Sequence, residues 1–261
     1  MARHGKDFRQ VLTAFAVVCS TAAGFCAGVD TALAQALDLD QPEIEAGERE
    51  IRSVNIGNFG YRAGSAGSPR SSHEVSASYS PRDWFKLTAH ADVENVIVDG
   101  TRLDHLALET LVGLRKARED GGLALSWFTS IQLSTDELST NSLLFGPVIK
   151  LSSGKASLTL NPYFEDTFGR NRASGIASIY AWQGKYELNE SVAIGIEGFG
   201  KIESLGDAPV WNEQDHRFGP GVFYSWDGDD KRKFGLDAGV LVGLTDAAPD
   251  VTFKLNFGIT Q

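Results

Sequence analysis

The sequence predicts an all-β protein: a transmembrane, antiparallel, up-and-down β-barrel of about twelve strands. Three observations predict it. Apolar and polar residues alternate in one segment after another along most of the chain. The chain opens with a basic and then apolar stretch of the kind that directs export. After that stretch there is no run of 18 apolar residues, so strands and not helices are the predicted spanning elements.

The clearest alternation covers residues 84–95 (W-F-K-L-T-A-H-A-D-V-E-N). Successive side chains of a strand point to opposite faces, so the apolar residues of this stretch share one face and the polar residues share the other. Phe85 and Val93 lie on an apolar face, and Lys86 and Glu94 lie on a polar one. A barrel in a bilayer needs an apolar outside and a polar inside, and this pattern supplies both.

Residues 1–34 are predicted to be a signal peptide, because a basic start is followed by an apolar run and then by small residues. Cleavage is expected after Ala34, with Ala36 as the alternative. Both cysteines, Cys19 and Cys26, lie inside this segment. The mature chain therefore has no disulfide, cysteine nucleophile or cysteine metal site.

Two further segments complete the predicted organisation. Residues 35–47 are acidic, contain Pro42, and are expected to form a periplasmic lead-in. Residues 48–261 are expected to form the barrel. The net charge of the whole chain is −10, which argues against nucleic acid as a partner because such binding needs a basic surface.

Turn residues divide the barrel region into the expected strands. Their connections alternate between tight turns and longer loops, as in bacterial outer-membrane barrels, and this order places both termini in the periplasm. The last strand must pair with the first, since an open edge is not tolerated in lipid. A soluble β-sandwich or lipocalin-like barrel is the alternative. The expected strands are 48–59, 73–80, 84–95, 103–116, 123–133, 142–151, 155–164, 173–188, 191–202, 216–226, 233–244 and 251–259.

The alternation also predicts which side chains face inward and which aromatic side chains sit at the membrane interfaces. The pore-lining candidates are Lys86, His90, Asp92, Glu94, His105, Glu109, Arg115, Lys185, Glu187, Glu197, Lys201, Arg217, Asp237 and Lys254. The expected aromatic girdle, near the strand ends, is Trp84, Trp182, Tyr186 and Trp226.

These faces favour a passive, porin-like channel for small solutes in the outer membrane of a Gram-negative bacterium. A lumen closed by paired charges, in a structural barrel or in an adhesive one with loop 203–215 as its contact, is the alternative. An outer-membrane lipid hydrolase is less favoured because no G-x-S-x-G occurs in the mature chain. His90, Asp92 and His105 are conceivable metal ligands, but hydrogen bonding in a polar lumen is the simpler interpretation, so no metal and no cofactor is predicted.

Three short motifs carry a resemblance: Pro42–Gly47 (P-E-I-E-A-G), His73–Val75 (H-E-V) and Asp83–Lys86 (D-W-F-K). With these the chain resembles an uncharacterised, porin-like group of proteobacterial outer-membrane β-barrel proteins. More loosely, it is similar to barrels proposed to take up hydrophobic compounds in aromatic degradation. The group supplies no catalytic residues to carry over, and the expected partners are outer-membrane lipid, small solutes in the lumen and the barrel assembly machinery. The chain departs from many such barrels in ending on Ile259-Thr260-Gln261, with Phe257 the aromatic residue nearest the end.

Overall fold

The computed structural model describes residues 37–60, 71–96, 100–118, 120–135, 140–170, 172–228 and 231–261. The predicted signal peptide lies outside these ranges. Within them the chain forms twelve strands and one short 3-10 helix, η2. The elements are β1 (Arg49–Phe59), β2 (Ser71–Arg82), β3 (Phe85–Val96), β4 (Gly100–Arg115), β5 (Gly121–Ser134), β6 (Asn141–Ser153), β7 (Ala156–Phe168), β8 (Ala177–Glu187), β9 (Val192–Ile202), η2 (Trp211–Glu213), β10 (Asp215–Asp227), β11 (Lys233–Gly243) and β12 (Val251–Thr260).

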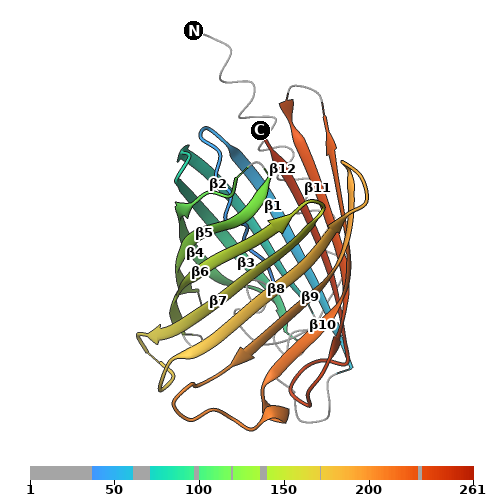
Figure 1. The fold of residues 1–261 in the computed structure, drawn as a ribbon. Helices are drawn as coiled ribbons and strands as arrows, with labels where there is room; N and C mark the ends of the chain where they lie inside the picture. The colour runs from blue at the N-terminus through green and yellow to red at the C-terminus, as the bar shows by residue number, and fades with distance from the viewer. Residues whose placement is uncertain are drawn as a thin grey trace.

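The strands close into one barrel, in which each strand pairs with the strand before and after it (Figure 1). Closure is made by β1 and β12, whose antiparallel register runs from Glu50 opposite Thr260 to Phe59 opposite Val251. Every strand therefore has two hydrogen-bonded neighbours, and no edge of the sheet is left open. The predicted twelve-stranded antiparallel barrel is confirmed.

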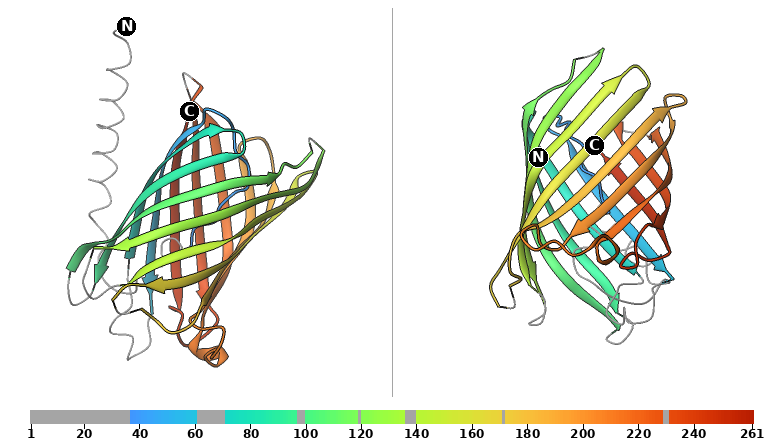
Figure 2. Two further views of the ribbon diagram at one scale, coloured as in Figure 1. Left: turned by 90° about the vertical axis from the view of Figure 1, so that its left-hand side faces the viewer. Right: turned by 60° about the horizontal axis from the view of Figure 1, so that its bottom comes forward.

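Short and long connections are sorted between the two ends of the barrel. The short ones join β2 to β3, β4 to β5, β6 to β7, β8 to β9 and β10 to β11, and these strand ends lie with the C-terminus at the top of Figure 1. Most connections at the other end are longer, and the longest described one, 203–214, carries η2. The exception at that end is between β3 and β4, because β3 ends at Val96 and β4 begins at Gly100. Figure 2 shows the closed wall from two further sides.

The outer face of the barrel is apolar. Leu108 and Phe253 each keep about half of their surface exposed, at 52% and 51%, as do many large side chains along other strands. So many exposed leucines, valines and aromatics would be unfavourable in water, whereas a bilayer would cover them. Among the described residues, no helix is long and apolar enough to span a membrane.

Three of the four expected girdle residues lie close to the short-connection end. Trp84 is in the β2–β3 turn, and Tyr186 is the last residue but one of β8. Trp226 stacks on Tyr224 and Phe234, with ring centroids 5.2 and 5.1 Å apart. Trp182 lies in the middle of β8 instead, where its indole covers the space above Gly198.

Candidate functional site: the lumen and its N-terminal segment

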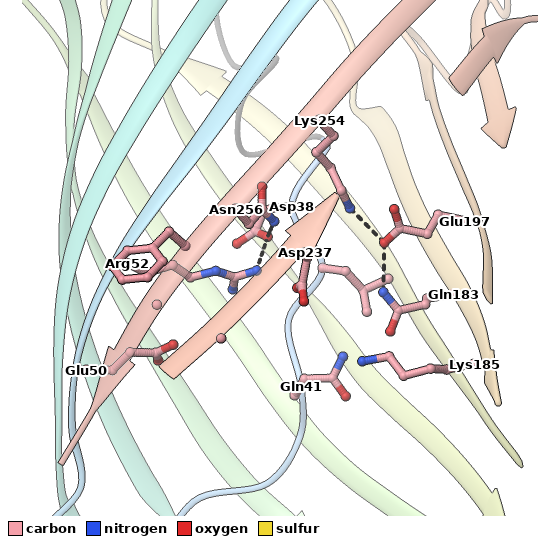
Figure 3. Close-up of a pocket in the computed structure, with 14 residues that line it drawn as sticks. Asp38, Gln41, Glu50, Arg52, Gln183, Lys185, Glu197, Asp237, Lys254 and Asn256 are labelled. Carbon is pink, nitrogen blue, oxygen red and sulfur yellow. Dashed lines mark hydrogen bonds and ion pairs between the residues drawn. The ribbon is translucent and has the colours of Figure 1, made fainter. Parts of the chain in front are cut away.

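Residues 37–47, which we call the N-terminal segment, lie inside the barrel. The chain reverses before β1, where Gly47 N donates to Ser80 O at 2.7 Å and adopts a φ of +89°. From there back to Leu37 the segment runs along the inner wall, and Figure 3 shows Asp38 and Gln41 among the side chains of the strands. The sequence placed these residues in front of the barrel as a periplasmic lead-in. The structure places them within it, because their side chains match partners on the inner wall.

Apolar packing holds the segment at two places. Leu37 and Leu39 are buried in a cluster that also contains Val54, Ile56, Ala181, Phe199 and Leu241. Ile44 is buried in a second cluster with Leu111, Phe128, Leu144, Val148, Tyr163 and Ile179. Burying one such aliphatic side chain contributes about 1.5–3 kcal/mol, before the entropy of ordering the segment is subtracted.

Hydrogen bonds attach the segment to β7 and β5. Asp40 N donates to Asn161 Oδ1 at 2.8 Å, and Asn161 Nδ2 returns a bond to Asp40 O at 3.2 Å. Tyr163 donates its hydroxyl to Asp40 Oδ2 at 2.7 Å. On β5, Ser126 donates to Pro42 O at 2.7 Å. These bonds satisfy backbone groups of a segment that belongs to no sheet, as buried backbone requires.

Ion pairs add a second kind of attachment. Asp38 pairs with Arg52 on β1 at 2.6 Å and accepts a longer contact of 3.4 Å from Asn256 on β12. Glu43 pairs with Lys150 on β6 at 2.9 Å. The segment thus bridges strands from opposite parts of the barrel, and it crosses the lumen at the level of these contacts.

A cavity of about 190 Å³ lies on one side of the segment, between Asp38 and the wall of β8, β9, β11 and β12 (Figure 3). Its wall contains a buried ion pair, in which Lys254 Nζ lies 2.7 Å from Glu197 Oε1. Gln183 donates to the same carboxylate oxygen at 2.7 Å. Lys254 also lies 4.9 Å from the centre of the Phe199 ring. Lys254 and Glu197 are thus paired with one another in the wall of this cavity.

A second cavity, of about 280 Å³, lies on the other side, against β1 to β5. Seven carboxylate side chains line it, against two cations, Arg52 and Lys86. Lys86 Nζ lies 2.8 Å from Glu50 Oε2. This cavity is acidic on balance, so it favours cations.

Further paired groups lie towards the longer loops. Arg217 pairs with Asp215 and donates to Asn58 at 2.8 Å and Thr252 at 3.0 Å. Lys201 lies 3.1 Å from Glu165. Paired polar side chains of this kind narrow the lumen while leaving its wall polar.

The structure brings most of the expected pore-lining residues to the interior. Arg115 and Glu187 are different, because they are exposed at the ends of β4 and β8. The buried residues of the set are His90, Asp92, Glu94, His105, Glu197, Arg217 and Lys254, and the partly buried ones are Lys86, Glu109, Lys185, Lys201 and Asp237.

The expected trio of His90, Asp92 and His105 separates. His90 and Asp92 stay together, with Nε2 and Oδ2 3.3 Å apart. His105 instead contacts the carboxylate of Asp104 and lies 3.2 Å from Thr140 O. A register irregularity between β3 and β4 next to Asp92 leaves Asp104 and His105 both buried, which simple alternation does not predict.

Sequence reasoning missed the residues that hold the N-terminal segment. The missed set consists of Leu37, Asp38, Leu39, Asp40, Ile44, Arg52, Asn161 and Tyr163. A signal was present: three large aliphatic residues, Leu37, Leu39 and Ile44, occur in a stretch otherwise rich in acids. Such residues need burial, and a purely solvated lead-in has no place for them.

The chain belongs to the family described as "Putative MetA-pathway of phenol degradation", whose model matches residues 61–260. Its fold is similar to that of an outer-membrane channel from Pseudomonas putida F1, at 11% identity and a TM-score of 0.61, over 86% of this chain and 99% of that one. It also matches the KdgM porin at 12% identity and a TM-score of 0.49, over 81% of this chain and 97% of that one. No curated protein matches the sequence.

Proposed function

We propose that this protein is an outer-membrane channel for small polar solutes, narrowed from within by its N-terminal segment. One observation carries the proposal. A closed barrel presents an apolar face outward and encloses cavities that are lined by charged side chains and are large enough for several water molecules. A structural barrel needs no such cavities, and a soluble barrel would bury its apolar face.

The apolar outer face supports a location in the outer membrane, with lipid as its covering and the barrel assembly machinery as its route of insertion. The sorted connections support short turns and both termini on the periplasmic side, with the longer loops outside the cell. Under this proposal residues 1–34 are a cleaved signal peptide. The mature N-terminus then lies at Gln35, or at Leu37 if cleavage follows Ala36, next to the part of the segment that the lumen holds. Intact-mass measurement of the exported protein gives the cleavage position.

The path of a solute runs beside the segment. A water molecule occupies about 30 Å³ in the liquid, so cavities of about 190 and 280 Å³ hold several waters each. Solutes of that size, and not large sugars or peptides, fit the space. The surplus of carboxylates in the larger cavity supports a preference for cations among charged solutes.

The family description supports a second solute class, small aromatic compounds such as phenols. The lumen wall does contain aromatic rings, for example Phe128 stacked on Tyr163 at 4.7 Å, but these are buried beside Ile44. The charged cavities therefore favour the polar class. Swelling of liposomes in phenol and in a neutral polar solute of equal size compares the two directly.

The experiment that tests the proposal is single-channel recording of the mature protein, refolded from detergent into a planar bilayer. We expect discrete conductance steps and, under a salt gradient, a reversal potential of the sign that marks cation preference. Glu50→Gln and Glu74→Gln each remove a carboxylate that lines the larger cavity, so each should reduce the preference for cations. Glu190→Gln, on an exposed turn, is the control and should leave that preference unchanged. A correctly folded barrel that stays silent would favour the closed-lumen alternative and reject the channel.

A further inference from the structure

Three side chains from two neighbouring strands meet beside the larger cavity, which one of them, Glu74, helps to line. Glu74 lies on β2 directly opposite Asp92 on β3, and His90 lies two residues before Asp92 on the same inward face. All three are buried, with exposed fractions of 4%, 6% and 5%. One donor atom from each can be chosen so that all three lie within 4.8 Å of one another.

Two buried polar atoms of this cluster have no hydrogen-bond partner. Nε2 of His90 is buried and makes no hydrogen bond, although Asp92 Oδ2 is only 3.3 Å away. Oδ1 of Asp92 is also buried without a hydrogen-bond partner. Buried polar atoms of this kind cost free energy unless something else binds them. An imidazole nitrogen and a carboxylate oxygen 3.3 Å apart, without a hydrogen bond between them, are placed so that one metal ion can bind both.

The geometry also fits a metal ion. Zinc binds histidine nitrogen and carboxylate oxygen at about 2.0–2.2 Å, so adjacent ligands of a tetrahedral ion stand about 3.4 Å apart. Nε2 of His90 and Oδ2 of Asp92 are 3.3 Å apart. All three donor atoms lie within 4.8 Å of one another, so rotation of the Glu74 side chain can bring its carboxylate to the tetrahedral spacing.

Glu109 supplies the outer support that such a site needs. Its Oε1 lies 3.3 Å from Nδ1 of His90. Histidine ligands commonly direct their second ring nitrogen at a carboxylate, which fixes the tautomer and leaves the other nitrogen free to bind the metal. A proton on Nδ1 directed at Glu109 therefore leaves the lone pair of Nε2 facing Asp92 and Glu74.

Charge balance favours a cation in the same place. Glu74, Asp92 and Glu109 bring three carboxylates to one histidine. The two cations that line the adjoining cavity are engaged elsewhere, Arg52 with Asp38 and Lys86 with Glu50. A divalent ion would enter from that cavity, of which Glu74 and Glu109 form part of the lining.

We propose that Glu74, His90 and Asp92 form a binding site for a divalent first-row transition ion of the Zn²⁺ type, with Glu109 orienting His90. One nitrogen and two oxygen ligands suit such ions, whereas Mg²⁺ and Ca²⁺ prefer oxygen alone. Water completes the coordination from the cavity. The ion would tie β2, β3 and β4 together across the inner wall, so the site is independent of whether the barrel conducts.

The test is direct binding of Zn²⁺ to the untagged mature protein, folded in detergent, by equilibrium dialysis and elemental analysis. We expect one tightly bound Zn²⁺ per chain, and a visible absorption band when Co²⁺ is used instead. His90→Ala should abolish both. Glu109→Gln should weaken binding by about 10–100-fold, as loss of an outer-shell partner does. His73→Ala is the matched control, because His73 lies beside Glu74 on β2 but contacts Asn55 at 2.9 Å instead.

Folding of each variant is checked by its heat-dependent migration on a gel. If His90→Ala does not fold, the near-isosteric Asp92→Asn and Glu109→Gln decide the question. Equal stoichiometry in wild type and in His90→Ala or Asp92→Asn would overturn the proposal, as would a wild type that binds no Zn²⁺. In either case a protonated His90 paired with carboxylates would explain the cluster.

Discussion

The inner wall of the barrel has two parts of opposite character. Around the middle of β5 to β8 it is largely uncharged, with Phe128, Leu144, Val148, Tyr163 and Ile179 facing inward. On β1 to β4 and β9 to β12 it is charged, and the ionisable inward side chains include Arg52, Glu74, His90, Asp92, Glu109, Glu197, Asp237 and Lys254. We call these the neutral wall and the charged wall.

The two walls solve the problem of a small lumen differently. The neutral wall would expose apolar side chains to water, and the N-terminal segment covers them with Ile44 and hydrogen-bonds to the polar groups among them. On the charged wall the segment packs Leu37 and Leu39 against a smaller apolar patch, whereas charged groups such as Lys254 and Glu197 pair with one another and face the cavities. The difference shows that an inward face need not be a pore-lining face.

Removing the N-terminal segment, which covers the neutral wall, should have the largest effect, and that effect is on conductance. A chain whose signal is joined directly to Glu48 lacks the N-terminal segment and leaves the lumen crossed only by the side chains of the wall. We expect a several-fold larger single-channel conductance in planar bilayers. Glu45→Gln, a change at an exposed position within the segment, serves as the control and should conduct like wild type. An unchanged step size in the deletion would show that the segment leaves the lumen in the membrane.

Breaking the central pair of the charged wall should have the next largest effect, on stability. Lys254→Met leaves Glu197 buried without its cation, which typically costs about 3–5 kcal/mol. We expect a lower temperature for the loss of the folded, fast-migrating form on unboiled gels. The double variant with Glu197→Gln should recover much of that loss because the unpaired charge is gone. Equal stability of the single and double variants would mean that water screens Glu197.

Weakening the contact of the segment with the wall should have a smaller effect. Leu39→Ala removes part of a buried cluster, and such a change costs about 2–5 kcal/mol in a rigid core. Here the loss acts on docking of the segment rather than on the barrel. We therefore expect faster proteolysis within residues 37–47 at an unchanged unfolding temperature. Val210→Ala, at an exposed loop position, is the comparison and should change neither.

The smallest effect on stability is expected in the exposed turns at the short-connection end of the barrel. Lys116 donates to Asp83 at 2.7 Å between exposed side chains, and this contact lowers the pKa of the Asp83 carboxyl. A lowered pKa means that the contribution is present above the usual pKa of aspartate and is lost as the pH falls through the lowered value. Because solvent screens the pair, Asp83→Asn should leave the unfolding temperature unchanged at neutral pH. A clear drop would show that the β2–β3 and β4–β5 turns depend on this contact.

Much of the fold follows from local pattern. The alternation in residues 84–95 predicts β3, observed as Phe85–Val96, and the turn residues predict eleven further strands. Local pattern predicts less well where along its strand a residue lies. Trp182 is expected near a strand end, but it lies in the middle of β8.

The candidate site was predicted less completely. Alternation identifies His90, Asp92, Glu197 and Lys254 as inward, but it does not pair them. Glu74 meets His90 and Asp92 because the register of β2 against β3 puts it opposite Asp92. His105 is opposite Asp92 in the register of β3 against β4, but its ring contacts Asp104, which the irregularity next to Asp92 leaves buried beside it.

The sequence by itself predicted the closed barrel, because strands with one apolar face follow one another behind an export signal and an open sheet edge is not tolerated in lipid. It also determined the inward position of most charges, because side chains in a strand alternate. Only the tertiary structure decided which charges pair and where the N-terminal segment lies. Those outcomes depend on contacts between residues far apart in sequence, such as Asp40 with Asn161 and Asp38 with Asn256. No local periodicity records such contacts, and they exist only after the barrel has closed.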